Sequence, residues 1–205
     1  MNRISEAVKI LKTGGIVVYP TDTAYGLAVD ATNEKAVRKL YRVKGREFKK
    51  PIHVIVPTKY CNTVTYYSKI VRLNSLAEKL IRKFWPGPLT VVLPLKGRGK
   101  SWQILSAGTK TIGIRYPANL MAQALVEPFK RPITTTSANI AGKPDCYSTA
   151  EVKKQFAKFK YKPDFYLDGG KLPKRPPSTV VSLVGHVKIL RQGPISEKEI
   201  KKALR

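Results

Sequence analysis

Ile16-Val17-Val18-Tyr19 runs directly into Pro20-Thr21-Asp22-Thr23-Ala24-Tyr25-Gly26. The first stretch is typical of a buried strand, and the second places hydroxyl groups and one carboxylate immediately after it. Sheets of α/β proteins commonly hold ligands at the ends of their strands. The residue types fit a ligand-binding loop and a proline-initiated turn equally well, so both interpretations stay open at this point.

Outward from this stretch, helical and strand-like segments alternate along the chain. Apolar residues recur either at helical spacing or in short β-branched runs. Predicted helices cover residues 4–11, 33–41, 73–84 and a stretch near 117–126, with two more helix starts at Ser148 and Ser196. Predicted strands cover residues 16–19, 52–56, 90–95, 112–115 and a run from 133, and a hairpin joins 179–183 to 187–190. This order predicts an α/β fold in which helices pack on a mixed, twisted, open sheet.

Local signals locate several helix ends. Gly14-Gly15 is expected to stop the first helix, and Asn33 is expected to cap the second. Pro117 suits the first turn of a helix, because its missing N–H has no partner there in any case. Capping-box spacing occurs twice, at Ser148 with Glu151 and at Ser196 with Glu199.

The chain is expected to form one domain over residues 1–205, since its length suits a single buried core. Residues 168–177 contain Gly169-Gly170 and three prolines among basic residues. This composition predicts a long loop rather than a domain linker, because too little chain follows it to make a second domain.

No stretch of the sequence approaches the roughly 20 apolar residues that a membrane-spanning helix needs. The first 15 residues are also too charged to resemble a secretory signal. We therefore expect a soluble, cytoplasmic protein with no membrane partner. Cys61 and Cys146 lie far apart in polar surroundings, so both are expected to be free thiols.

The charge balance is unusual: 39 Lys and Arg against 13 Asp and Glu give a formal net charge of +26. Such a field attracts nucleic acid and speeds encounter with any phosphorylated ligand, so a polyanionic partner is expected. Charge alone does not separate RNA binding from ATP use. Adaptation of a whole proteome to an unusual habitat is a further explanation that the composition leaves open.

Two motifs carry residues suited to binding anions and small polar ligands. Lys44-Gly45-Arg46, followed by Lys49-Lys50, could converge several cations on one loop, although a solvated basic loop would look the same. The run from Ile133 to Asn139 ends a strand in hydroxyl and amide groups, which could equally serve local capping. The sequence has no Walker loop and no G-x-G-x-x-G motif, so a triphosphate here would be held by side chains.

The histidines, His53 in a strand pattern and His186 in a hairpin turn, are both expected to be structural. They do not combine with other residues into a catalytic triad or a cluster of metal ligands. This pattern favours chemistry driven by positioning and electrostatics over hydrolysis with a dedicated base.

Six fragments resemble the YrdC-like family in composition, order and spacing, and together they cover nearly the whole chain. Each fragment is weak, but the ordered set is highly specific. They are residues 19–27 (Tyr-Pro-Thr-Asp-Thr-Ala-Tyr-Gly-Leu), 44–46 (Lys-Gly-Arg), 85–90 (Trp-Pro-Gly-Pro-Leu-Thr), 114–117 (Ile-Arg-Tyr-Pro), 136–139 (Thr-Ser-Ala-Asn) and 178–181 (Ser-Thr-Val-Val). The resemblance implies a single α/β domain built around a large basic cavity.

The family resemblance also implies an activity. Members of this kind condense L-threonine with bicarbonate or CO2 and transfer the carbamate to the α-phosphate of ATP, giving threonylcarbamoyl-AMP and pyrophosphate for tRNA modification. Mg²⁺ is expected to accompany ATP. The expected partners are ATP, L-threonine, bicarbonate, tRNA or other RNA on the basic surface, and a downstream threonylcarbamoyl transferase.

By the same resemblance, individual residues receive roles. Lys44 and Arg46 are the expected catalytic cations, and no protein side chain is assigned to a metal. Thr23, Arg115, Thr135 and Ser178 are expected to hold threonine, with Arg115 suited to a bidentate grip on its carboxylate. The residues expected to bind ATP are Arg46, Lys50, Ser137, Asn139 and Arg191.

The chain departs from the family pattern at three positions. It has Glu47 where proline often follows Lys-Gly-Arg, and it has Asp22 and Ala24 where glutamate and valine are common. Longer relatives carry a second domain and an interdomain linker that helps to cover the cavity. Two alternatives remain: a double-stranded RNA or tRNA-binding module without catalysis, and a carbamoyltransferase component, because YrdC-like domains also occur within larger carbamoyltransferases.

Overall fold

The computed structural model describes residues 3–58 and 63–205, and of residues 63–66 only the backbone. The strands are β1 (Val17–Pro20), β2 (Tyr25–Ala28), β3 (His53–Ile55), β4 (Leu89–Pro94), β5 (Thr111–Arg115), β6 (Ile133–Ser137), β7 (Phe165–Tyr166), β8 (Thr179–Ser182) and β9 (Lys188–Arg191). The helices are α1 (Arg3–Lys12), α2 (Glu34–Lys44), α3 (Thr63–Ile70), α4 (Ser75–Phe84), α5 (Lys100–Leu105), α6 (Leu120–Phe129), α7 (Thr149–Phe156) and α8 (Glu197–Leu204).

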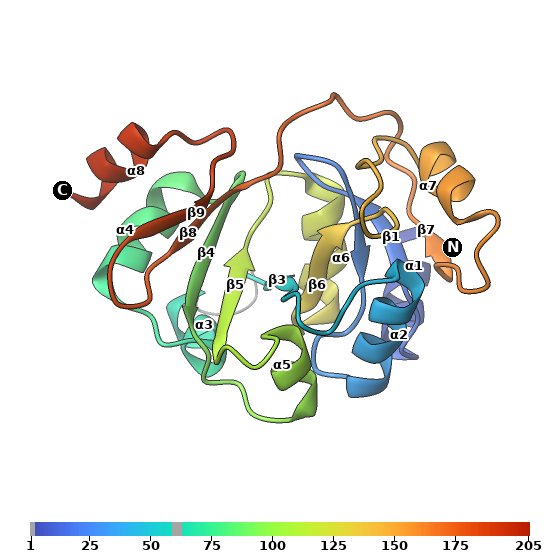
Figure 1. Cartoon of the computed structure of the whole chain (residues 1–205), viewed down its shortest axis with the longest axis horizontal. Coiled ribbons are helices and arrows are strands. Elements are labelled where there is room, and N and C mark those ends of the chain that lie inside the picture. The colour runs from blue at the N-terminus through green and yellow to red at the C-terminus, as the bar shows by residue number, and fades with distance from the viewer. Residues whose placement is uncertain (1–2, 59–62) are drawn as a thin grey trace.

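The described strands form one open sheet in the order β7-β1-β2-β6-β3-β5-β4-β8-β9. Figure 1 shows this sheet from β9 on the left to β7 on the right. Three pairs are parallel, namely β1 with β7, β3 with β5, and β4 with β8, and the remaining pairs are antiparallel. This confirms the predicted mixed α/β sheet. It also puts β3, β5 and β6, which come from distant parts of the chain, side by side at the centre.

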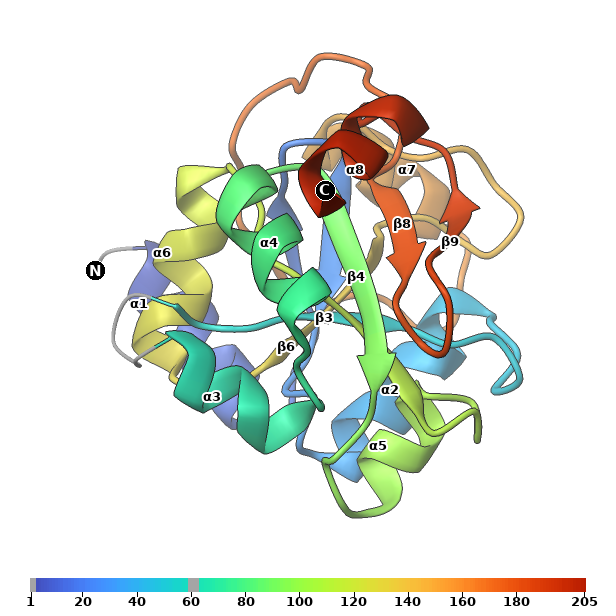
Figure 2. The same ribbon diagram turned by 90° about the vertical axis from the view of Figure 1, so that its left-hand side faces the viewer.

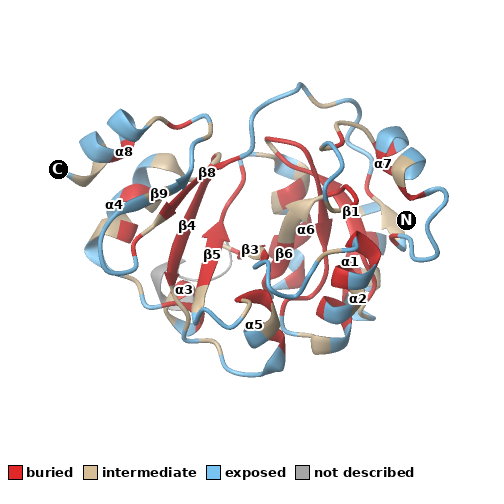
Figure 3. Ribbon diagram, in the orientation of Figure 1, coloured by how far each residue is buried: buried red, intermediate tan, exposed pale blue. Residues whose placement is uncertain are grey.

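The core divides into two apolar clusters, one on each side of the sheet. Val17 and Tyr19 of β1 belong to the cluster under α1 and α6, whereas Ile16 and Val18 belong to the larger cluster that contains α2. Alternate residues of a strand point to opposite faces, which explains this division. Figure 2 shows α1 beside α6 and α2 beside α5, and Figure 3 shows that the central strands are buried while the outer helix faces are exposed.

Most predicted helix ends are confirmed. The Asn33 side chain accepts a hydrogen bond from Ala36 N at the start of α2, and α1 ends just before Gly14. Ser196 and Glu199 form a complete capping box at α8. The predicted hairpin is present as β8 and β9, joined across residues 184–186.

Two predicted helix starts were wrong in detail. Pro117 does not open a helix: α6 starts three residues later, because Asn119 Oδ1 accepts hydrogen bonds from the backbone N–H groups of Met121 and Ala122. At α7, Ser148 caps as predicted, but the Glu151 carboxylate accepts from Tyr147 N at 2.6 Å instead of from Ser148 N. Only half of the expected capping box therefore forms.

Four elements had no sequence prediction: β2, α3, α5 and β7. The α5 helix has six residues and β7 has two, so neither offers enough turns or alternations for a periodic signal. The β2 strand begins at Tyr25, inside the stretch that the sequence presented as a loop. Strand β3 is also shorter than predicted, with three residues instead of five.

The predicted long loop, residues 168–177, contains no helix or strand and passes over the ends of the central strands from β7 to β8 (Figure 1). Its first residues are tied to β2, because the Tyr25 hydroxyl donates to Gly170 O at 2.7 Å and accepts from Gly169 N at 2.9 Å. The loop delivers Ser178 to the start of β8 beside the central strands.

None of the helices in the described part of the chain is long and apolar enough to cross a membrane. Cys146 is a buried free thiol, as predicted, and burial raises its pKa to about 11. The matching prediction for Cys61 falls outside the described residues.

Candidate active site

A cavity of about 260 Å³ lies over the central strands. Residues from six strands and four loops meet around it, so it is created by the fold and not by one local segment. Its lining residues are Thr21, Thr23, Ala24, Tyr25, Gly26, Arg46, Pro51, Ile52, His53, Thr90, Arg115, Thr135, Thr136, Ser137, Asp145, Pro177, Ser178 and Arg191.

The cavity wall is basic and rich in hydroxyl groups. Arg46, Arg115 and Arg191 line it, while Asp145 is the single carboxylate among the described lining residues. Burial lowers the pKa of each arginine, yet a guanidinium keeps its proton at any physiological pH. The cavity is therefore a receptacle for anions.

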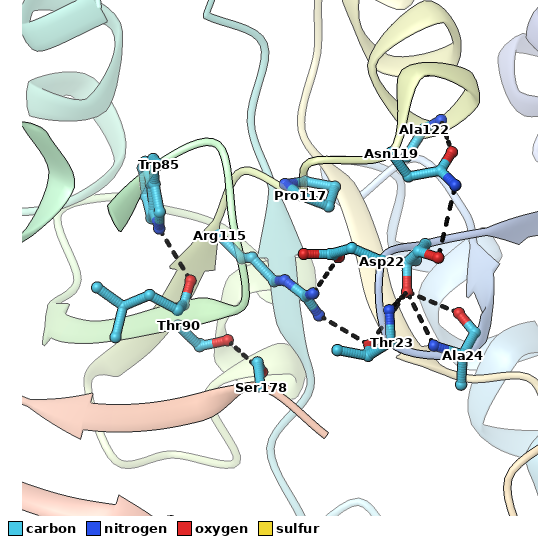
Figure 4. Close-up of polar contacts among 12 residues, drawn as sticks. Asp22, Thr23, Ala24, Trp85, Thr90, Arg115, Pro117, Asn119, Ala122 and Ser178 are labelled. Atoms are coloured by element: carbon cyan, nitrogen blue, oxygen red, sulfur yellow. Dashed lines mark hydrogen bonds and ion pairs between the residues drawn. The ribbon is translucent and has the colours of Figure 1, made fainter. Parts of the chain in front are cut away.

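Arg115 projects from the end of β5 and forms a buried ion pair with Asp22, as Figure 4 shows. Its second terminal nitrogen donates to Thr23 Oγ1 at 3.4 Å. Arg115 Nε and Asp22 Oδ2 are both buried without a hydrogen-bond partner. Buried polar groups normally find hydrogen-bond partners. Arg115 can therefore still donate one hydrogen bond, and Asp22 can still accept one, to a molecule in the cavity.

A second arginine, Arg191 at the end of β9, is held by Ser178, the residue just before β8. Arg191 Nε donates to Ser178 O at 3.0 Å, and Arg191 Nη2 donates to Ser178 Oγ at 3.1 Å. Ser178 Oγ also lies 2.9 Å from Thr90 Oγ1 on the neighbouring strand β4 (Figure 4). These contacts hold two hydroxyls and one guanidinium in a fixed arrangement on one side of the cavity.

The third arginine sits on the loop after α2. Gly45 ends the helix with φ near 60°, a left-handed conformation that favours glycine, and the chain then turns to present Arg46. Arg46 Nη2 donates to Pro51 O at 2.9 Å, which folds the loop back on itself.

Lys50, expected to bind ATP, points elsewhere. Its side chain is exposed, pairs with Glu47 at 3.0 Å and is absent from the cavity wall. Glu47 is the residue that replaces the common proline, so this departure supplies Lys50 with a local partner.

Lys44 lies behind the wall instead of on it. Its side chain is buried, and Nζ donates to Ser137 O at 2.5 Å, Asn139 Oδ1 at 2.5 Å and Asn139 O at 3.0 Å. Burial lowers the Lys44 pKa to about 7. Asn139 is itself buried, and its amide donates to Lys143 O. Lys44 and Asn139 thus support the loop after β6, while Ser137 reaches the cavity.

The Thr21 to Thr23 stretch forms the turn that one interpretation of its sequence predicted, and it also lines the cavity. Thr21 Oγ1 donates to Ala24 O at 2.6 Å and lies 3.1 Å from Thr23 Oγ1. The turn joins β1 to β2 and aims Thr23 at Arg115. Thr135 faces the same space from β6.

The geometry agrees with what similarity to known proteins shows. The Sua5_yciO_yrdC family model, whose description reads "Telomere recombination", matches residues 9–193. The chain belongs to the Sua5/YciO/YrdC family.

Individual relatives of this family cover most of the chain. A Methanocaldococcus jannaschii protein is 39% identical over 175 residues, which is 85% of this chain and 77% of the relative. The threonylcarbamoyl-AMP synthase of Pyrococcus abyssi is 34% identical over 203 residues, or 98% of this chain. The crystal structure of P. abyssi Sua5 complexed with L-threonine superposes with a TM-score of 0.87 at 33% identity over 98% of this chain. This chain spans only 57% of the length of the P. abyssi relative.

Most of the site residues that were predicted from the sequence line the cavity. Of the ten residues expected to form the site, seven line the cavity, and Lys44, Lys50 and Asn139 do not. Sequence reasoning missed His53, Thr90 and Asp145. Thr90 ends a quoted motif and could have been found from that position, whereas His53 and Asp145 lie in segments without a recognisable signal.

Among the described residues, no group of three or more His, Cys, Asp or Glu side chains is placed to hold a metal ion. Asp145 is a single carboxylate beside three arginines. This donor set fits a cation that arrives bound to phosphates and water, with at most one protein ligand.

Proposed function

We propose that this chain is a threonylcarbamoyl-AMP synthase that uses ATP, L-threonine and bicarbonate. The observation that carries the proposal is the cavity itself: residues of all six family motifs meet there, with three arginines next to a group of hydroxyls. The 34% identity to a relative of that name, over almost the whole chain, supports it.

The proposed reaction has two steps. The amino nitrogen of threonine forms a bond to the carbon of CO2, supplied by bicarbonate, and loses a proton to give a carbamate. A carbamate oxygen then attacks the α-phosphorus of ATP, and the bond to the pyrophosphate leaving group breaks. Both steps gather negative charge in one place, so fixed cations in a shielded site would stabilise the second transition state.

Threonine is proposed to bind beside Arg115. A guanidinium carries five N–H donors, and Arg115 Nε is without a partner, so it can accept a carboxylate while it keeps Asp22. Thr23, Thr135 and Ser178 are proposed to surround the rest of the amino acid with hydroxyl groups. Binding in this way would give the unpaired Arg115 nitrogen its missing partner.

The triphosphate is proposed to lie against Arg46 and Arg191, with Ser137 on the nucleotide side. Lys44 and Asn139 are proposed to act through Ser137, because their side chains bond to the loop that carries it. Lys50 is proposed to reach phosphate only by leaving Glu47, a surface pair that costs about 0–1 kcal/mol to break. Mg²⁺ would enter with ATP, where it neutralises phosphate charge.

The remaining surplus of positive charge is proposed to serve tRNA. Lys153, Lys154 and the basic residues of the 168–177 loop are exposed on the surface around α7. Such a surface supports sequence-tolerant contact with a phosphate backbone. We propose a cytoplasmic enzyme, acting as one domain, whose product passes to a threonylcarbamoyl transferase.

Pyrophosphate release tests the function. With ATP and Mg²⁺, release should require both L-threonine and bicarbonate, and L-serine should be a poorer substitute because it lacks the methyl group. Carbamoyl phosphate should not replace threonine and bicarbonate, which separates this activity from carbamoyl transfer. Release that is independent of threonine would refute the proposal.

A further inference from the structure

His53 occupies a central place in the cavity. It begins β3, directly opposite Thr135 on β6, and β3 pairs on its other side with β5, which carries Gly113 and Arg115. The residue lies partly exposed and lines the cavity. It therefore sits between the hydroxyl and the guanidinium that are proposed to bind threonine.

The imidazole is held flat against the strand next to it. A Cβ atom at position 113 would overlap His53 Nδ1, so the ring occupies the space that glycine leaves open. Nδ1 is buried and has no hydrogen-bond partner. A buried N–H without a partner is rarer and costlier than a buried acceptor without one. The arrangement therefore favours an unprotonated Nδ1 and places the ring proton on Nε2.

Electrostatics keep the ring neutral. Burial, followed by the charges of Arg191, Arg46 and Arg115, lowers the His53 pKa to about 4. Near neutral pH the ring is thus an uncharged donor surrounded by three cations, and no described residue of the cavity has the same character. The ring N–H can therefore donate a hydrogen bond to a substrate oxygen that receives none from the guanidinium groups.

We infer that His53 is a substrate-contacting residue whose Nε2–H donates a hydrogen bond to the carbamate formed from threonine. The inference rests on the proposed function. In the carbamate, one oxygen must attack phosphorus while the other becomes a carbonyl. A neutral donor suits the second oxygen, because it orients the group without withdrawing charge from the attacking oxygen as a cation would. The position of His53 between Thr135 and Arg115 matches the nitrogen end of an amino acid whose carboxylate is held by Arg115.

Histidine NMR tests the inference directly, because the chain contains two histidines and His186 is exposed in the turn between β8 and β9. In the full chain labelled with ¹⁵N, the His53 ring should show the neutral Nε2–H form from pH 6 to 8. Addition of L-threonine with bicarbonate, without ATP, should shift the His53 nitrogen signals more than L-threonine alone, and His186 signals should stay in place. A charged ring, or the Nδ1–H form, overturns the inference.

Variants give an independent measurement. His53→Leu should lower kcat/KM for threonine about five- to tenfold, the effect of one neutral hydrogen bond, with KM for ATP unchanged. His53→Gln, which keeps an N–H donor, should recover part of the loss. Gly113→Ala should reproduce the defect by displacing the ring, and His186→Leu is the matched control.

The outcomes separate the inference from the proposed function. If threonine shifts the backbone signals of Thr23 and Arg115 but leaves His53 unchanged, or His53→Leu has normal kinetics, the inference fails and the synthase assignment stands. If wild-type protein releases no threonine-dependent pyrophosphate, the proposed function fails, and the inference fails with it.

Discussion

Replacement of Lys44 by methionine measures what a buried ammonium does to stability. The wild-type ammonium makes three hydrogen bonds to the loop after β6, yet burial lowers its pKa from 10.5 to about 7. Between these two values the unfolded chain binds more protons at Lys44 than the folded chain does. The free energy of unfolding therefore rises with pH through this window, and the cost of the buried charge is fully present only below pH 7.

The size of the effect follows from the two pKa values. At pH 7 the cost at Lys44 is about 4 kcal/mol, and at pH 9 it is about 2 kcal/mol, since one pKa unit corresponds to about 1.4 kcal/mol. Lys44→Met removes this dependence but leaves carbonyl groups without partners, at about 1–3 kcal/mol for each. The two effects oppose one another at pH 7, so the variant should be only modestly less stable there and clearly less stable at pH 9.

Urea unfolding at pH 7 and pH 9 provides the assay. The gain in unfolding free energy between the two pH values should be about 2 kcal/mol larger for the wild type than for Lys44→Met. Other titrating groups are common to both proteins and cancel in the comparison. Equal gains would mean that the three acceptors hold the ammonium charged, and the argument from burial would then be wrong.

Three further predictions concern the cavity and the surface. Arg46→Ala and Arg115→Ala should each lower kcat/KM by an amount equivalent to about 2–4 kcal/mol. The control variant Arg38→Ala, on the exposed face of α2, should leave kcat/KM unchanged. Normal kinetics in both cavity variants would place the site elsewhere. Asp22→Asn should destabilise the fold by about 3–5 kcal/mol, measured by urea unfolding, because it leaves the buried Arg115 charge uncompensated; an unchanged midpoint would show that the ion pair is dispensable. Binding of tRNA should weaken steeply with salt, because each neutralised phosphate contributes about −0.9 to the log-log slope on duplex nucleic acid and about −0.7 on single strands. Binding that is unaffected by neutralisation of the surface cluster would refute this explanation of the charge. That cluster comprises Lys153, Lys154, Lys158, Lys160, Lys162, Lys171, Lys174 and Arg175, all of which are exposed.

The fold could be predicted where the signal was local. Apolar periodicity and capping side chains located α1, α2, α4 and α8, since a helix satisfies its own backbone and its ends depend on nearby residues. The prediction at Pro117 was wrong because Pro117 and Asn119 are both residues that can begin a helix, and α6 begins after the Asn119 cap. The strand order could not be derived from the sequence. Strand β3 pairs with β5 and β6, which lie far away along the chain, and no local residue pattern shows which strands pair or in which register.

The site divides in the same way. Thr23, Arg46, Arg115, Ser137 and Ser178 were found because they stand in motifs, and the fold brings them to one cavity. Lys44 stands in a motif too, but residue type alone does not show whether an ammonium faces the cavity or the loop behind it. His53 shows the reverse case, because its role depends on the empty space beside Gly113 and on three distant arginines.

In the proposed reaction, this cavity joins a threonine-derived carbamate to AMP. Mass spectrometry of the nucleotide product formed from ATP, L-threonine and ¹³C-labelled bicarbonate tests this reaction, with Arg115→Ala as a control of low activity. The product should be threonylcarbamoyl-AMP that carries one ¹³C atom, formed together with pyrophosphate and strongly reduced in the control. AMP or ADP without an attached threonylcarbamoyl group, or a product without the label, would contradict it.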